Sequence, residues 1–174
     1  DLESVRHIVG VQLRNLATVG GSIYSRFGFS DVLTMFLALN ASVELYKGGV
    51  VPLAEYAQRP YDRDILVRVL VPKENARFVY QSVRNSQTDF PVLTCAAAKL
   101  ADGSIRAAIG ARPGKAVLYT AAPEAGETAE KFAARFAAEV KADIKTESNL
   151  RGGAEYRRHL AGVLTKRAVC RLEG

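Results

Sequence analysis

The stretch RNLATVGGSIYSRFGFSD, from Arg14 to Asp31, places two adjacent glycines, Gly20 and Gly21, upstream of an acid. Because glycine has no Cβ, a Gly-Gly step lets a polyanion approach the main chain and lets successive N–H groups converge on it. The acid precedes an apolar segment with helical spacing, so Ser30 or Asp31 is expected to cap a helix there. The stretch therefore predicts one of two arrangements. Either an anion-binding segment precedes a carboxylate that accepts from hydroxyl groups, or a tight turn precedes a plain helix cap.

The composition is that of a folded protein with a buried core. The chain has 174 residues, of which 48% are hydrophobic and 24% charged, and this fits one large domain or two small ones. We find no apolar run long enough to span a bilayer and no secretory signal, so we expect no membrane association. The opening DLESVRHIVG is typical of the middle of a fold, and we expect further chain upstream of it.

Cysteine and histidine are sparse and isolated. Cys95 and Cys170 are the two cysteines of the chain, far apart in the sequence, which excludes a four-cysteine iron–sulfur cluster or zinc site on this chain alone. Two lone thiols without a signal peptide favour a reduced, cytoplasmic protein. His7 and His159 have no partner motif, so we assign no catalytic residue and no metal ligand.

Positive charge is concentrated near the C-terminus. The net charge is +6, and six basic residues but only two acids follow Leu150. This pattern is compatible with a solvated helix face, an acidic protein partner or nucleic acid. No aromatic stacking platform accompanies the charges, which counts against single-stranded nucleic acid.

The N-terminal part alternates between helical and strand patterns. Apolar residues at helical spacing predict a helix over residues 31–39. Residues 41–47 alternate apolar and polar, and the turn residues KGG, 47–49, predict a hairpin with Val50-Val51. Residues 64–72 are β-branched and end in proline, which predicts a strand that stops there.

After Pro72 the pattern changes to that of a sheet covered by helices. Residues 76–84 predict a strand, and the two apolar segments around Asp102-Gly103 predict a hairpin. Helical stripes then run over residues 129–144 and 156–164, the second after Gly152-Gly153. We therefore predict an α+β fold in two parts, residues 1–73 and 74–174, with the boundary near 72–75.

The motifs occur in the order of a known family. RNLATVGGSI, an SD before an apolar helix, a strand ending in proline, FVYQSVRNSQTDFPV and LRGGAEYRRHLAGVLTKRA follow one another along the chain. This order resembles the FAD-binding (medium) subunit of the molybdenum hydroxylases, the xanthine dehydrogenase and carbon monoxide dehydrogenase type. The resemblance implies that residues 1–73 are the C-terminal lobe of a two-lobed FAD-binding fold. It also implies that residues 74–174 are the C-terminal α+β domain of the flavin subunit.

The resemblance also implies a set of cofactor-binding residues. The second of the family's two glycine-rich loops, which hold the FAD pyrophosphate, matches Thr18, Val19, Gly20, Gly21 and Ser22. The family aspartate at the sugar-alcohol portion of the flavin matches Asp31, and the hydrophobic residue beside the isoalloxazine ring matches Leu66. The first glycine-rich loop is not found in this sequence. Gln81 stands where many members have a lysine, so a positive neighbour of the flavin or of its acceptor would be missing.

By the same resemblance, the protein is an FAD-dependent oxidoreductase subunit. It would take electrons from an iron–sulfur subunit and pass them through FAD to NAD or another acceptor, while hydroxylation occurs on a molybdenum-cofactor subunit. The basic C-terminal helix or the adjoining hairpin would lie at or near an interface with these subunits. The alternatives are another FAD oxidoreductase with a similar pyrophosphate loop and a scaffold module that has lost flavin. A third alternative, a basic nucleic-acid-binding protein, is supported by charge alone.

Overall fold

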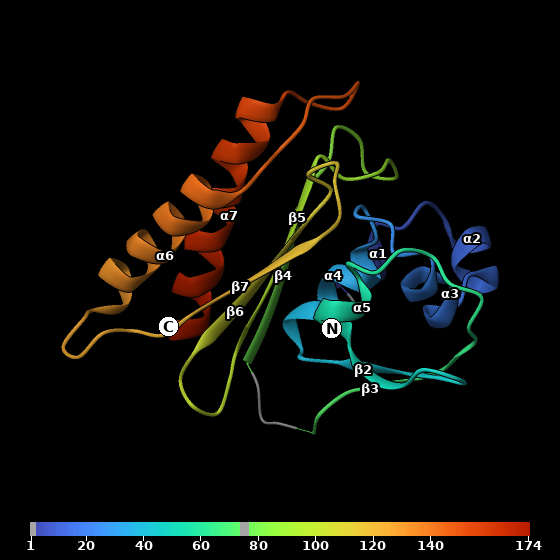
Figure 1. The fold of residues 1–174 in the computed structure, drawn as a ribbon. Coiled ribbons are helices and arrows are strands. Elements are labelled where there is room, and N and C mark those ends of the chain that lie inside the picture. Colours follow the sequence, from blue (N-terminus) through green and yellow to red (C-terminus); the bar gives the residue numbers. More distant parts are fainter. Residues whose placement is uncertain (1–2, 74–76) are drawn as a thin grey trace.

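Two antiparallel sheets organise the chain in the computed structural model, which describes residues 3–73 and 77–174 (Figure 1). The smaller sheet has the order β2-β1-β3 and the larger the order β4-β5-β6-β7. The strands are β1 Ser42–Leu45, β2 Gly49–Pro52, β3 Leu66–Leu70, β4 Arg77–Val83, β5 Leu93–Lys99, β6 Ile105–Gly110 and β7 Val117–Ala121. The helices are α1 Glu3–Arg6, α2 Val11–Leu16, α3 Val19–Tyr24, α4 Asp31–Ala38, α5 Leu53–Tyr56, α6 Ala129–Asp143 and α7 Ala154–Glu173. The predicted α+β class is confirmed.

The smaller sheet contains the predicted hairpin and the predicted strand that ends in proline. Gly49 takes a φ of +65°, which a residue with a side chain rarely adopts, at the turn between β1 and β2. The carboxylate of Asp64 accepts from the N–H groups of Lys47 and Gly48, at 2.9 and 2.8 Å. β3 spans Leu66–Leu70, so it begins later and ends earlier than the predicted strand over residues 64–72.

The predicted helix after the glycine pair is α4, and Ser30 caps it. The hydroxyl of Ser30 accepts from the N–H of Leu33 at 3.2 Å, so Asp31 is the first helical residue and not the cap. Leu33 and Leu37 are buried on this helix, which packs against β5 and β6 of the larger sheet. α4 therefore joins the N-terminal elements to the C-terminal sheet.

The larger sheet is covered on both faces. The segment TCAAAK of β5 is buried at every position before Lys99. Cys95 and Ala97 belong to the core shared with α6 and α7, whereas Ala96 and Ala98 belong to the core shared with α4. Small side chains let elements approach from both sides. Figure 1 shows α6 and α7 side by side on one face and α1 to α5 on the other.

The C-terminal elements follow the sequence prediction closely. The hairpin between β5 and β6 turns at Gly103, which has a φ of +84°. α6 forms where its stripe predicts it, whereas α7 continues to Glu173, well beyond the predicted stripe over residues 156–164. β7 was not predicted, because its residues are half-exposed and show no clear alternation. The expected boundary between the two parts and the first residue of the 76–84 strand fall at residues 74–76, outside the described residues.

Two further features of the described residues concern metal binding and membrane insertion. Over residues 3–73 and 77–174, no group of three or more His, Cys, Asp or Glu side chains could hold a metal ion. Within the same ranges, none of the helices combines the length and the apolar character needed to cross a membrane.

Candidate functional site

The glycine pair lies in the first turn of α3 and not in an extended loop. Thr18 is the N-cap, and its hydroxyl oxygen accepts from the N–H of Gly21 at 3.0 Å. The hydroxyl of Ser22 donates to the carbonyl of Thr18 at 3.0 Å, beside the first intrahelical bond. The expected glycine-rich loop is therefore a capped helical turn. The N–H groups of Val19 and Gly20 precede its first intrahelical donor.

The two glycines differ in the space around them. A Cβ at Gly20 would meet nothing within 4 Å, whereas a Cβ at Gly21 would lie 3.0 Å from the hydroxyl oxygen of Thr18. Val19 is also exposed. The backbone at Gly20 is thus open to a ligand, while Gly21 allows the capping side chain to approach.

An open groove runs between α3 and the start of β3. It is lined by Gly20, Gly21, Tyr24, Asp64, Ile65 and Leu66. Leu66 packs against the core of the N-terminal elements and also faces this groove. The structure therefore brings three of the residues expected at the flavin, Gly20, Gly21 and Leu66, to one surface.

Ser22 and Asp31 line a separate pocket of about 190 Å³. Its walls come from the segment after α1, from α3 through the start of α4, and from the segment that follows β4. The hydroxyl of Ser30 donates to the carbonyl of Ser22 at 3.2 Å and so ties α3 to the start of α4. Thr18 and Val19 line neither the groove nor the pocket.

Asp31 is held from the C-terminal sheet. It is only 6% exposed, and its Oδ1 accepts from the hydroxyl of Tyr80 and from the guanidinium of Arg84. Burial, followed by the nearby charge of Asp31, raises the pKa of Tyr80 well above its usual value, so this hydroxyl stays a donor. Asp31 is thus an ion-paired carboxylate at the pocket.

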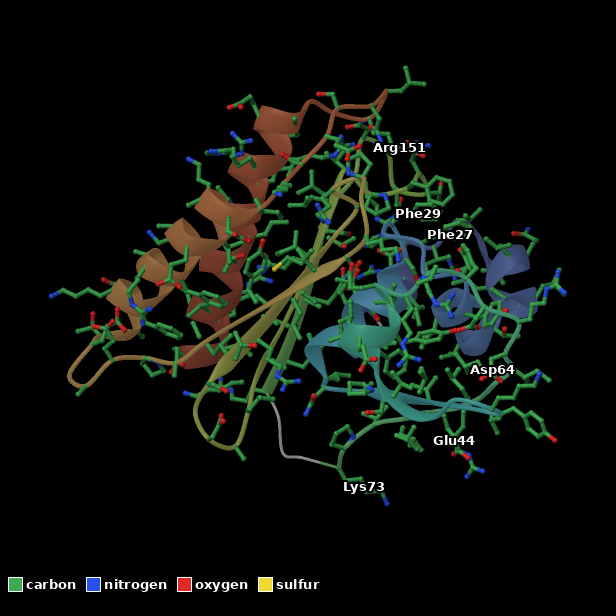
Figure 2. The ribbon with its side chains drawn as sticks, viewed as in Figure 1. Phe27, Phe29, Glu44, Asp64, Lys73 and Arg151 are labelled. Carbon is green, nitrogen blue, oxygen red and sulfur yellow. The ribbon has the colours of Figure 1, made fainter. Side chains whose placement is uncertain are left out.

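An aromatic wall closes the outer side of the pocket. Phe27 and Phe29 stack with ring centroids 5.0 Å apart, and Phe29 meets Phe90 at 4.5 Å. The guanidinium of Arg151 lies 5.1 Å from the ring centroid of Phe90. Figure 2 shows Phe27, Phe29 and Arg151 gathered at one end of the molecule. All three phenylalanines are more than a third exposed, which is unusual for such large apolar side chains.

The basic groups here also hold the segment between β4 and β5. Arg84 donates to the carbonyl of Asp89 at 2.6 Å, and Arg151 pairs with the Asp89 carboxylate at 2.9 Å. The hydrogen bond from Arg151 is the largest of the effects that lower the pKa of Asp89. These contacts fix the position of Phe90 at the mouth of the pocket.

Gln81 lies on the face of β4 that packs against α7. Its side chain donates to the carbonyl of Leu164 in α7 at 3.3 Å, on the face of β4 away from the pocket. Because side chains alternate along a strand, Tyr80 belongs to the opposite face, toward α4. The positive group at the pocket is Arg84, which the sequence analysis missed. Tyr80, Ser82 and Arg84 are alternate residues, so the strand pattern could have placed Arg84 on the same face as Tyr80.

Comparison with known proteins places the chain in a class of flavoproteins. Residues 2–74 match the FAD binding domain in molybdopterin dehydrogenase, and residues 78–172 match the CO dehydrogenase flavoprotein C-terminal domain. The chain therefore belongs to the family of FAD-binding medium subunits of molybdenum hydroxylases, as the sequence motifs predicted.

Individual proteins similar to this chain include one curated protein and two solved structures. The uncharacterized protein YgfM of Escherichia coli (strain K12) is 26% identical over 162 residues, which are 93% of this chain and 61% of YgfM. Quinoline 2-oxidoreductase from Pseudomonas putida 86 is 20% identical with a TM-score of 0.80, over 98% of this chain and 65% of that chain. Carbon monoxide dehydrogenase from Hydrogenophaga pseudoflava is 23% identical with a TM-score of 0.82, over the same shares. The solved structures show that the fold is shared. The chain spans less than two thirds of the length of each of these relatives.

Proposed function

We propose that this chain is the FAD-binding electron-transfer component of a molybdenum hydroxylase. The observation that carries the proposal is the buried, ion-paired Asp31 at a pocket beside the open Gly20-Gly21 turn, in a chain whose two halves match both domains of the flavoprotein family. Bound FAD would supply the redox chemistry, taking electrons from iron–sulfur clusters and passing them to NAD or another acceptor. The chain itself would bind and orient the cofactor, and no side-chain acid or base is required.

The proposed contacts divide among the groove, the pocket and the turn between them. The turn formed by Thr18, Val19, Gly20, Gly21 and Ser22 would hold the FAD diphosphate, because its open backbone lets a polyanion approach. Asp31 would accept from the hydroxyls of the sugar-alcohol chain. Leu66 would give an apolar contact to the isoalloxazine ring. The placement of Asp31 in the pocket and of Leu66 in the separate groove supports this division.

We further propose the domain division expected from the sequence. Residues 1–73 would be the C-terminal lobe of the FAD-binding domain, and residues 74–174 the C-terminal domain of the flavin subunit. The separate family matches on either side of residues 75–77 support this division. The cytoplasmic location stays a prediction.

The proposed partners are an iron–sulfur subunit and a molybdenum-cofactor subunit. The basic helix α7 exposes fewer unpaired positive charges to a partner than the number of its basic residues suggests. Arg157 is buried and Arg158 pairs with Glu155, which leaves Lys166, Arg167 and Arg171 exposed. Reversing the charge at Lys166 and Arg171 should slow assembly with the two subunits and flatten its salt dependence. Unchanged assembly kinetics would place the docking surface elsewhere.

Titration with FAD tests the cofactor assignment directly. We expect quenching of flavin fluorescence on binding, with FAD bound more tightly than FMN. Gly20→Ala should weaken FAD binding by about tenfold, a loss of about 1.4 kcal/mol, because its methyl group would occupy the open approach to the backbone. Unfolding of the apoprotein should show no loss of stability in this variant. Equal FAD affinity in Gly20→Ala and the parent would contradict the diphosphate assignment.

The same titration distinguishes the alternatives. A parent protein that binds no FAD would be a scaffold that has lost flavin. A protein that binds FAD but assembles with neither an iron–sulfur nor a molybdenum subunit would be a different kind of FAD oxidoreductase.

A further inference from the structure

We propose that Tyr80 and Arg84 are positioning residues that hold one oxygen of the Asp31 carboxylate, so that the other oxygen is presented to hydroxyl groups of the ligand in the pocket. The inference rests on the proposed function and deepens it, because it adds two residues of the C-terminal sheet to the flavin site.

The contacts divide the carboxylate into a held oxygen and a free one. Both Tyr80 and Arg84 donate to Oδ1 of Asp31. Among the residues that the structure describes, no protein group donates to Oδ2, and this oxygen is not fully enclosed. Since Asp31 lines the pocket, Oδ2 is the oxygen available to a ligand. A carboxylate oxygen accepts hydrogen bonds and donates none, so its partner must carry O–H or N–H groups.

The two donors are themselves rigidly placed. Tyr80 is 4% exposed and the side chain of Arg84 is 7% exposed, so both are fixed by packing. Arg84 is also held at Nη1 by the Asp89 carbonyl, at 2.6 Å, and at Nε by the hydroxyl of Ser82, at 3.3 Å. Because the guanidinium is planar and is anchored at Nε and Nη1, its Nη2 is held in a fixed direction toward Asp31. The Asp31 carboxylate is therefore an acceptor whose orientation is set by these donors before the ligand arrives.

The arrangement also stabilises the buried charge. A carboxylate buried to this extent is costly unless it is paired and hydrogen-bonded, and Arg84 and Tyr80 supply the pair and the hydrogen bond. A purely structural ion pair between Asp31 at the start of α4 and Arg84 just after β4 would give the same contacts. The two roles differ in one respect: only a positioning role makes the effect of Tyr80 and Arg84 depend on hydroxyl groups in the ligand.

The test compares FAD with an FAD analogue whose ribityl hydroxyls are replaced by a plain five-carbon chain. Dissociation constants are measured for the parent, Tyr80→Phe and Arg84→Lys. We expect FAD affinity to fall about fivefold to tenfold in Tyr80→Phe, with the analogue bound equally by the variant and the parent. Arg84→Lys keeps the positive charge but loses the fork geometry, so it should show a loss of the same kind.

Tyr119→Phe is the matched control. Tyr119 also donates to an aspartate, Asp143, at 3.0 Å, but it does not line the pocket. Its loss should change the affinity for neither ligand. Equal losses for FAD and the analogue in Tyr80→Phe, or no loss for FAD in either variant, would overturn the inference while leaving FAD binding by the parent intact. A parent that binds neither ligand would overturn the proposed function and this inference together.

Discussion

Thr34 on α4 and Thr94 on β5 are completely buried, and their hydroxyl oxygens lie 3.2 Å apart. The hydroxyl of Thr34 also reaches the carbonyl of Ser30 at 3.0 Å. This pair lies where α4 crosses the larger sheet, and Gly110 of β6 lies beside it. A Cβ at Gly110 would be 2.5 Å from each threonine hydroxyl oxygen and 2.8 Å from the carbonyl oxygen of Gly28. The contact between the two halves of the chain therefore depends on the absence of a side chain at Gly110.

Gly110→Ala should lower the free energy of unfolding by about 1 to 3 kcal/mol, the usual cost of overpacking a core. Backbone carbonyls and buried hydroxyls cannot move aside as a flexible side-chain end can. Chemical denaturation of the purified protein measures the effect. Gly20→Ala is the matched control, because its Cβ has open space and alanine favours the helix, and it should not be destabilised. Equal stability of Gly110→Ala and the parent would show that α4 can shift without cost.

Arg157→Leu should cost about 3 kcal/mol or more of folding stability. The side chain is 1% exposed and donates to the carbonyls of Val92, Glu147 and Gly152 and to the side chain of Asn149. Its removal leaves the carbonyl of the buried Val92 without this donor and removes three further hydrogen bonds in partly buried surroundings. The neighbouring Arg158→Leu, which loses only a partly exposed pair, should change the unfolding midpoint little. Similar midpoints for the two variants would contradict this interpretation.

Acid should weaken the contact between Glu127 and Arg135. Two hydrogen bonds, of 3.0 and 2.9 Å, lower the pKa of Glu127 from its ordinary 4.5 to about 2. A carboxyl with a lowered pKa stabilises the fold above its unfolded-state pKa, and this contribution is lost as the pH falls from about 4.5 to about 2.

Thermal unfolding of Glu127→Gln and the parent at several pH values checks this expectation. The difference in melting temperature should be present at pH 7 and shrink through that range. Glu139→Gln, which alters the more exposed partner of Arg135, should differ little from the parent throughout. A difference for Glu127→Gln that is the same at pH 7 and at pH 2 would refute the assignment.

The two cysteines should react with a thiol reagent at very different rates. Burial raises the pKa of Cys95 to about 12, and the side chain is fully enclosed, whereas Cys170 is exposed. The thiolate is the reactive form, so the native protein should be labelled once, at Cys170, and the denatured protein twice. Mass spectrometry after labelling gives the count. Rapid labelling of Cys95 under native conditions would mean that the sheet and α7 separate readily.

The sequence determined many of the local elements and the family, but it did not predict α1, α2, α3, α5 or β7. Capping residues, turn glycines and periodic apolar residues predicted α4, both hairpins and the two C-terminal helices, because these signals act over a few residues. The ordered motifs from RNLATVGGSI to EYRRHL predicted the flavoprotein family, which the family matches confirm. The individual flavin-binding residues stay predictions.

Only the tertiary structure decided which residues meet. The expected glycine loop is a capped helical turn. The groove that Leu66 lines is separate from the pocket that Asp31 lines, and the side chain of Gln81 contacts α7. The tertiary structure also brought Arg84 to Asp31 from 53 residues away. No local pattern specifies such a pairing. It follows from the packing of α4 on an alanine-rich sheet, whose small side chains let the helix and β4 place their polar groups at one pocket.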